Sequence, residues 1–244
     1  MNQNILLKIQ YIGTNYCGWQ KQNNGKSIQQ EIERAICEVT GKQVNLIGSG
    51  RTDSGVHALE QVANFVIDTT IPVEKIKYAI NYYLPEDIRI IESKAVEDSF
   101  HARYSSKKKT YCYRINMNEI ESPFEKNRSY FVGKELDLSK MKEQSKFLIG
   151  EHDFAAFQSE GSSVKTTVRT IYSLEINCIN NIAEIHIIGN GFLYNMVRII
   201  AGTLIEIGKG KDYSIVDILN TKQRENAGPT APACGLFMEK VEYD

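Results

Sequence analysis

The chain has 244 residues, 42% of them hydrophobic, and this length permits one large domain or two small ones with a proper core. Lys and Arg number 29 against 30 Asp and Glu, so the net charge of −1 argues against a surface that grips polyanions everywhere. Any nucleic-acid site must therefore be a local patch of basic residues.

The sequence predicts a reduced, cytoplasmic protein that does not enter the membrane. Its first residues lack the features of a signal peptide, and no stretch approaches the roughly 20 apolar residues that cross a bilayer. The five cysteines are scattered and include no Cys-x-x-Cys pair, so they favour neither a disulfide framework nor a zinc site.

Strands and helices alternate in the first half of the chain. The patterns predict strands at 4–12, 44–47, 61–67 and 87–98. Ser27 and Gln30 form a capping box, and the apolar residues that follow at helical spacing up to Gly41 predict a helix. Pro72 opens a second helix that ends near Leu84. This order suits an α+β layer with helices on one face of a largely antiparallel sheet.

The second half repeats this mixture of strands and helices. We expect helices at 138–149, 191–210 and 215–221, a loop at 152–163, strands at 167–178 and 182–189 joined by a turn at Asn180 and Asn181, and a closing strand at 236–241. Two similar α+β domains are predicted, 1–105 and 106–244, although no sequence repeat proves their relation.

The loop that begins the stretch 48–65 concentrates polar chemistry between two predicted strands. Asp53 lies at its centre, with Arg51 two residues before it and His57 four residues after it. A metal site at Asp53 and His57 lacks a third ligand, and a phosphate-binding loop lacks the following Lys-Ser/Thr. Catalysis by Asp53 as nucleophile or base remains, with Arg51 favouring the ionised carboxylate. A purely structural Arg/Asp pair is the competing interpretation.

A basic segment, defined here as 101–115, is the strongest charge feature. It carries Arg103, Arg114 and the run Lys107, Lys108 and Lys109 without an acid, and Tyr104, Tyr111 and Tyr113 interleave with these cations. Cations bind phosphates and aromatic faces stack on unpaired bases, so this segment is a candidate RNA surface. A solvated edge strand protected by lysines is the alternative.

Three further features bear on a site. The loop 13–22 either faces a ligand or uses Tyr16 and Trp19 to cover the edge of the core. Arg198 lies in an otherwise apolar predicted helix, where a cation needs an anionic partner because an unpaired buried charge is costly. The four histidines receive no catalytic role, and His57 is expected to shape its loop by hydrogen bonding.

Several motifs together resemble the tRNA pseudouridine synthase A family. RTDSGVHA at 51–58 and GFLYNMVR at 191–198 are the most specific of them. YIGTNYCGWQKQ, KTYCYRI, HDFAAF and the terminal PACGLFMEKVEY follow the family in order and spacing. The resemblance covers essentially the whole chain.

The resemblance implies a cofactor-independent isomerase that converts uridine to pseudouridine at positions 38, 39 and/or 40 in the anticodon stem-loop of tRNA. It also implies the pseudouridine synthase fold, with two related α+β domains, and a homodimer. By this resemblance Asp53 is the catalytic aspartate, Arg51 the arginine of the same motif, Tyr111 the tyrosine that stacks on the target base, and Arg198 the arginine paired with the aspartate. No metal is implied. A non-catalytic RNA-binding protein and a metal-dependent hydrolase built on Asp53 and His57 are the rival hypotheses.

Overall fold

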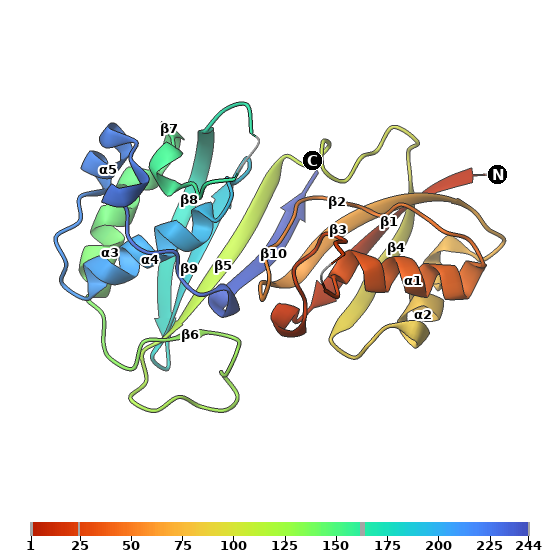
Figure 1. The fold of residues 1–244 in the computed structure, drawn as a ribbon, viewed down its shortest axis with the longest axis horizontal. Coiled ribbons are helices and arrows are strands. Elements are labelled where there is room, and N and C mark those ends of the chain that lie inside the picture. Colours follow the sequence, from red (N-terminus) through yellow and green to blue (C-terminus); the bar gives the residue numbers. More distant parts are fainter. Residues whose placement is uncertain (1, 24, 162–163, 244) are drawn as a thin grey trace. The chain divides into compact units, whose positions relative to one another are not determined.

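The chain forms two compact units in a computed structural model that describes residues 2–23, 25–161 and 164–243. The first unit runs to Lys107 and takes up the chain again from Met238, and the second unit is Lys108–Phe237 (Figure 1). The last strand, β10 (Leu236–Glu242), therefore begins in the second unit and ends in the first. The domains 1–105 and 106–244 stay a prediction.

The first unit is an antiparallel sheet with two helices. Its elements are β1 (Asn2–Tyr11), α1 (Ile28–Thr40), β2 (Ile47–Gly48), β3 (His57–Asp68), α2 (Val73–Tyr83) and β4 (Ile88–Val96). The strand order is β4-β1-β3-β10, with β2 paired to β3. Helix α2 packs on β4 and α1 packs on α2. The central strand β1 buries Ile5, Leu7 and Ile9 completely.

Helix α1 forms where its capping signals predict it. The Ser27 side chain accepts a hydrogen bond from the Gln30 amide, and Gly41 ends the helix in the left-handed conformation. Ile28, Ile32 and Ile36 make the buried stripe. The signals for α2 also hold, although Pro72 is the residue before the first helical residue.

The second unit combines a sheet with helices in the same manner. Its elements are β5 (Lys108–Asn116), β6 (Tyr130–Phe131), α3 (Leu138–Ser145), β7 (Gly150–Asp153), β8 (Val168–Ile179), β9 (Ile182–Gly189), α4 (Met196–Gly208) and α5 (Ile215–Thr221). The order β5-β9-β8-β7 is antiparallel, and β6 adds to β5 in parallel. Helix α4 packs on β5 and α3, and α3 packs on β8.

The β8–β9 hairpin confirms the predicted turn. Asn180 and Asn181 both have positive φ, 52° and 59°. Two successive residues of this kind make the two-residue turn whose twist matches that of the strands, and asparagine tolerates this conformation well.

Four elements differ from the prediction. Strand β2 is only Ile47–Gly48 because the Leu46 amide bonds to the Glu33 side chain and its carbonyl accepts from Gln29, so helix α1 takes the place of a strand partner. Strand β7 begins at Gly150 and extends into the first two residues of the predicted loop 152–163, of which 162–163 are outside the described residues. Helix α3 gives way to a 3-10 turn at Lys146–Leu148, and α4 begins at Met196 rather than at 191.

The α+β class with a largely antiparallel arrangement of strands flanked by helices is confirmed. All five cysteines are free. Within the described part of the chain, no helix has the length and apolarity that crossing a membrane requires.

Candidate active site

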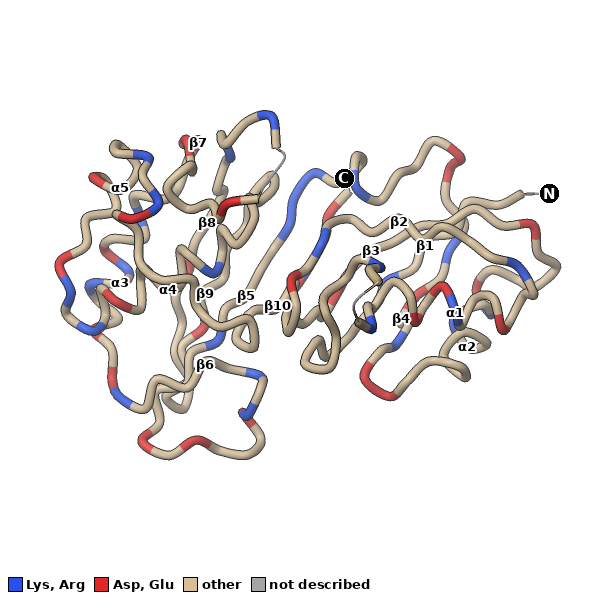
Figure 2. The backbone as a smooth tube through the Cα atoms, in the orientation of Figure 1, with Lys and Arg blue, Asp and Glu red and all other residues tan. Residues whose placement is uncertain are grey.

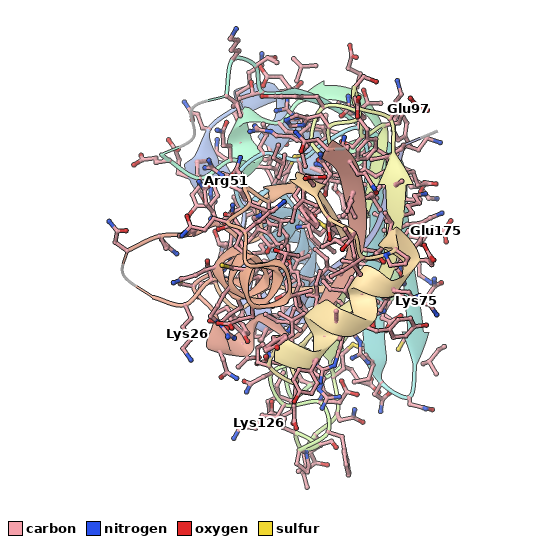
Figure 3. The ribbon with its side chains drawn as sticks, turned by 90° about the vertical axis from the view of Figure 1, so that its right-hand side faces the viewer. Lys26, Arg51, Lys75, Glu97, Lys126 and Glu175 are labelled. Atoms are coloured by element: carbon pink, nitrogen blue, oxygen red, sulfur yellow. The ribbon has the colours of Figure 1, made fainter. Side chains whose placement is uncertain are left out.

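The loop between β2 and β3 carries Asp53 and is tied down at Thr52. The Thr52 carbonyl accepts a hydrogen bond from the Trp19 amide at 3.0 Å, and its hydroxyl lies 2.8 Å from the Tyr11 hydroxyl. Burial raises the pKa of Tyr11, which keeps its hydroxyl protonated. Each such bond contributes about 1 kcal/mol. Asp53 itself is half-buried, while Arg51 extends from the loop at the surface (Figure 3).

Residues 13–19 form the support behind this loop. Gly18 has φ +103°, and a Cβ added there would lie 2.6 Å from the Thr52 carbonyl oxygen, so only glycine permits this approach. The Ser54 hydroxyl donates to the Tyr16 carbonyl at 3.0 Å. The Val56 amide donates to the Asp53 backbone carbonyl, which closes a tight turn that begins at Asp53. The backbone on both sides of Asp53 is therefore fixed.

Both ends of the loop are also anchored. At its start, the Gln61 side chain donates to the Gly50 carbonyl and accepts from the Ser49 hydroxyl. At its end, fully buried His57 accepts a hydrogen bond from the Gly13 amide through Nδ1 at 3.0 Å. The prediction that His57 shapes the loop by hydrogen bonding is confirmed.

Tyr16 and Trp19 are buried, at 6% and 3% exposure. Of the two interpretations of the loop 13–22, the structure supports the one in which these rings cover the core edge. The sequence marked this loop by its two glycines, but its role as the support of Thr52 depends on contacts with residues more than thirty positions away, which no local pattern reveals.

Tyr111 and Tyr113 lie on β5 of the second unit. Tyr111 is 8% exposed, and its ring meets the Phe192 ring edge to face with centroids 5.2 Å apart. Tyr113 is fully buried and donates its hydroxyl to the Pro232 carbonyl. The expectation that both tyrosines belong to an RNA-facing aromatic surface is therefore wrong for Tyr113, which is a core residue.

Arg198 lies in the first turn of α4, not in the middle of a longer helix as predicted. It is half-buried, and the positive end of the helix dipole disfavours a cation there. Local acceptors offset this cost, because Nε donates to the Ala231 carbonyl and Nη1 to the Asn195 side chain, each at 2.8 Å. These contacts orient the guanidinium.

The segment 227–232 packs closely against α4 because each of the two has a glycine at the point of contact. A Cβ on Gly202 would lie 1.8 Å from the Pro229 carbonyl oxygen, and the Gly228 amide bonds to the Thr203 hydroxyl at 2.9 Å. The sequence showed this segment only as turn-rich, so its role in holding Arg198 was missed.

The predicted site residues fall into two groups, one in each unit. Asp53, Arg51, Arg103 and Lys107 belong to the first unit. Tyr111, Arg198, Lys108 and Lys109 belong to the second.

Cations and exposed tyrosines pair in and near the basic segment. Lys108 lies 5.5 Å from the centre of the Tyr172 ring, and the Arg103 guanidinium lies 5.8 Å from that of Tyr104, which is 77% exposed. Arg114 instead pairs with Glu125 and Glu184. Figure 2 shows acidic and basic residues interspersed along the rest of the chain. The run Lys107–Lys109 is thus a local cationic feature on a nearly neutral molecule.

Comparison with known proteins identifies the family of the chain. A family model described as tRNA pseudouridine synthase matches residues 8–105 and 145–244. The chain is 53% identical to tRNA pseudouridine synthase A 2 of Clostridium tetani over 250 residues, covering all of both chains. It is 49% identical to tRNA pseudouridine synthase A of a Thermoanaerobacter species, covering 99% of this chain and 100% of that one.

A solved structure of a Cbf5-Nop10-Gar1 complex contains a chain that is 13% identical, with a TM-score of 0.34 over 83% of this chain and 54% of that chain, a likeness too weak to carry an argument. The family match and the full-length relatives decide the assignment. The chain belongs to the tRNA pseudouridine synthase family.

Proposed function

We propose that the protein converts uridine to pseudouridine at positions 38, 39 and/or 40 of the tRNA anticodon stem-loop, with Asp53 as its catalytic carboxylate. The observation that carries the proposal is the immobilised loop around Asp53, in which Thr52, Ser54 and Val56 all have fixed backbone or side-chain partners. A carboxylate held in this way is preorganised for chemistry on a bound nucleotide.

The reaction exchanges one bond to the ribose for another. The N1–C1′ glycosidic bond breaks, the uracil turns, C5 bonds to C1′, and the proton lost from C5 is balanced by one gained at N1. The target base lies in or beside a stem, so it must first leave the stack, which costs a few kcal/mol. Arg51, exposed in the loop, is suited to enter the vacated space.

Asp53 acts on the flipped nucleotide in one of three ways: attack on C1′, removal of the C2′ proton, or attack on the pyrimidine ring. In each, Arg198 pairs with the carboxylate and keeps it ionised. Its Nε and Nη1 bonds to Ala231 and Asn195 support this role, because they fix the direction of the guanidinium. Tyr111 supplies a flat face that retains the detached uracil.

The cationic run Lys107–Lys109, with Arg103, binds tRNA phosphates. The pairing of Lys108 with Tyr172 and of Arg103 with Tyr104 supports this assignment, since RNA surfaces combine cations with aromatic faces. We also propose that the protein acts in the cytoplasm as a homodimer, in which two basic segments contribute to one tRNA-binding face.

The test is to incubate the purified protein with unmodified tRNA transcripts and to map pseudouridine at single-nucleotide resolution. The proposal predicts new pseudouridine confined to positions 38–40, without added cofactor and with activity retained in excess chelator. Binding of tRNA without conversion would instead identify a non-catalytic RNA-binding protein, and chelator-sensitive cleavage of the tRNA would favour the metal-dependent hydrolase hypothesis.

A further inference from the structure

Three potential metal ligands lie together on the sheet of the second unit. Cys112 on β5, and Glu184 and His186 on β9, place one ligand atom each within 4.8 Å of the others. Cys112 and His186 are directly opposite each other in the antiparallel register, and Glu184 is two residues before His186 on the same face. The ligands come from two strands, which is why no cysteine or histidine motif in the sequence announced them.

The two separations that involve His186 Nε2 are close to those that a tetrahedral ion requires. With bonds of about 2.3 Å to sulfur and about 2.1 Å to nitrogen or oxygen, ligand atoms lie roughly 3.6 Å apart for S and N and roughly 3.4 Å apart for N and O. The Glu184 Oε2 to His186 Nε2 distance is 3.4 Å, and the Cys112 Sγ to His186 Nε2 distance is 4.0 Å. A shift of about 0.4 Å brings Cys112 Sγ and His186 Nε2 to that spacing, and the third separation, from Cys112 Sγ to the Glu184 carboxylate, is within 4.8 Å.

The surroundings suit such an ion. Arg114 donates from Nε to Glu184 Oε1, so the carboxylate is oriented with Oε2 toward His186. A hydrogen bond of this kind to a ligating carboxylate is a common support in metal sites. Arg114 also pairs with Glu125, whose carboxylate offsets the positive charge of the guanidinium. Cys112 is 5% exposed, whereas the side chains of Glu184 and His186 are 36% and 28% exposed, so an ion enters from their side.

We propose that Cys112 Sγ, His186 Nε2 and Glu184 Oε2 bind one divalent cation of the zinc class, with solvent as the fourth ligand. The mixed sulfur, nitrogen and oxygen donors favour Zn²⁺ over Mg²⁺ or Ca²⁺, which prefer oxygen alone. Binding releases the thiol proton to solvent, because the thiolate is the ligand. The ion joins β5 to β9 on the face opposite to Tyr111, since neighbouring residues of a strand point to opposite faces.

The experiment uses the full chain, stripped of metal with a chelator and kept reduced. Zn²⁺ binding is measured by calorimetry, and Co²⁺ is added separately to look for the absorption band of a cobalt–thiolate bond. We expect one ion per chain, a thiolate band, and a Zn²⁺-dependent rise in the unfolding midpoint. Cys112→Ser abolishes the band, and Cys112→Ser and His186→Gln each weaken Zn²⁺ binding roughly 100-fold or more.

The matched control is Cys178→Ser, which removes an exposed cysteine on β8. It keeps the wild-type affinity and band. Absence of Zn²⁺ binding by the wild type, or a Cys112→Ser protein that binds as tightly as the wild type, overturns the site. Loss of the cobalt–thiolate band in Cys178→Ser overturns the site as well. Should Cys112→Ser fail to fold, the more exposed His186→Gln decides by the same affinity measurement.

Discussion

Substitutions of Tyr111 distinguish two contributions of its side chain, that of the flat ring and that of the hydroxyl group. Its ring packs edge to face on Phe192, which holds the plane in place, and phenylalanine preserves that plane. We expect Tyr111→Phe to retain most of the turnover and Tyr111→Ala to lose about 1–3 kcal/mol of stacking. The measurement is the rate of pseudouridine formation at saturating tRNA. Equal and severe losses in both variants contradict a stacking role and assign the function to the hydroxyl, as acceptor of the C5 proton.

Gly18 tests whether the support behind Asp53 matters for catalysis. A methyl group there meets the Thr52 carbonyl at 2.6 Å and must displace the loop, in addition to the strain of a positive φ. We expect Gly18→Ala to lower both the free energy of unfolding and the turnover per folded molecule.

Gly41→Ala is the matched control for that variant. Gly41 also has positive φ, +69°, but a Cβ there would meet nothing within 4 Å. We expect Gly41→Ala to lose about 1–2 kcal/mol of its free energy of unfolding from backbone strain alone and to keep wild-type turnover. Turnover of Gly18→Ala equal to that of Gly41→Ala would show that the position of Thr52 is not critical.

For helices and turns, local sequence patterns predicted the features that depend on interactions between neighbouring residues. Helix α1 has a side-chain cap at Ser27 and a glycine stop at Gly41, and the β8–β9 turn requires the positive φ that Asn180 and Asn181 adopt. Strand β2 was predicted too long because Glu33, thirteen residues from Leu46, bonds to its backbone. Long-range competition of this kind leaves no trace in a short window of sequence.

The candidate site also combines features that the sequence predicted with features that it did not. The motif around Asp53 marked the loop, but the hydrogen bonds from Tyr11 and Trp19 that fix it were invisible in the sequence. The position of Arg198 was predicted within a helix, whereas its placement in the first turn follows from Asn195, which adopts positive φ before the helix begins. The Ala231 carbonyl, which accepts a hydrogen bond from Arg198, belongs to a segment that no periodic sequence pattern connects to α4.

Near the end of helix α4, an ion-pair group makes the stability of the protein depend on pH. Glu206 is buried, and hydrogen bonds from Lys209 and Lys211 hold its pKa below the ordinary value. Its stabilising contribution is therefore present above the unfolded-state pKa and is lost as pH falls through the lower folded-state pKa. Because Lys211 is largely exposed, solvent screens its part of this contribution.

We expect Glu206→Gln to lower the free energy of unfolding at pH 7 and to differ less from the wild type as the pH falls below the ordinary glutamate range. Urea unfolding at a series of pH values measures this difference. Exposed Glu143 on α3, changed to Gln, is the control and leaves stability nearly unchanged. A wild-type to Glu206→Gln difference that grows in acid would contradict the ion-pair account.

For the whole molecule, charge is the property that shapes tRNA binding. The net charge is −1, so the overall field does not favour a polyanion, and the proposed tRNA binding has to come from the local run Lys107–Lys109 and Arg103. We expect tRNA affinity to fall steeply with salt, and replacement of the three lysines by glutamine to flatten the salt slope by about 1 for each lost phosphate contact.

The control for the lysine variant is Lys75→Gln with Lys77→Gln on α2, which removes exposed or half-exposed cations outside the basic segment. Filter binding or anisotropy at several salt concentrations gives the slopes. Affinity that does not respond to salt, or an α2 variant with the same loss as the basic-segment variant, contradicts binding through this run.

We propose that a single carboxylate, Asp53, performs the isomerisation on a tRNA uridine. The most direct measurement is single-turnover pseudouridine formation by Asp53→Asn, together with the tRNA affinity of the same variant. Asparagine keeps the size of the side chain and removes the negative charge, so the account predicts no detectable pseudouridine with tRNA affinity close to that of the wild type. Appreciable turnover by Asp53→Asn would contradict the account.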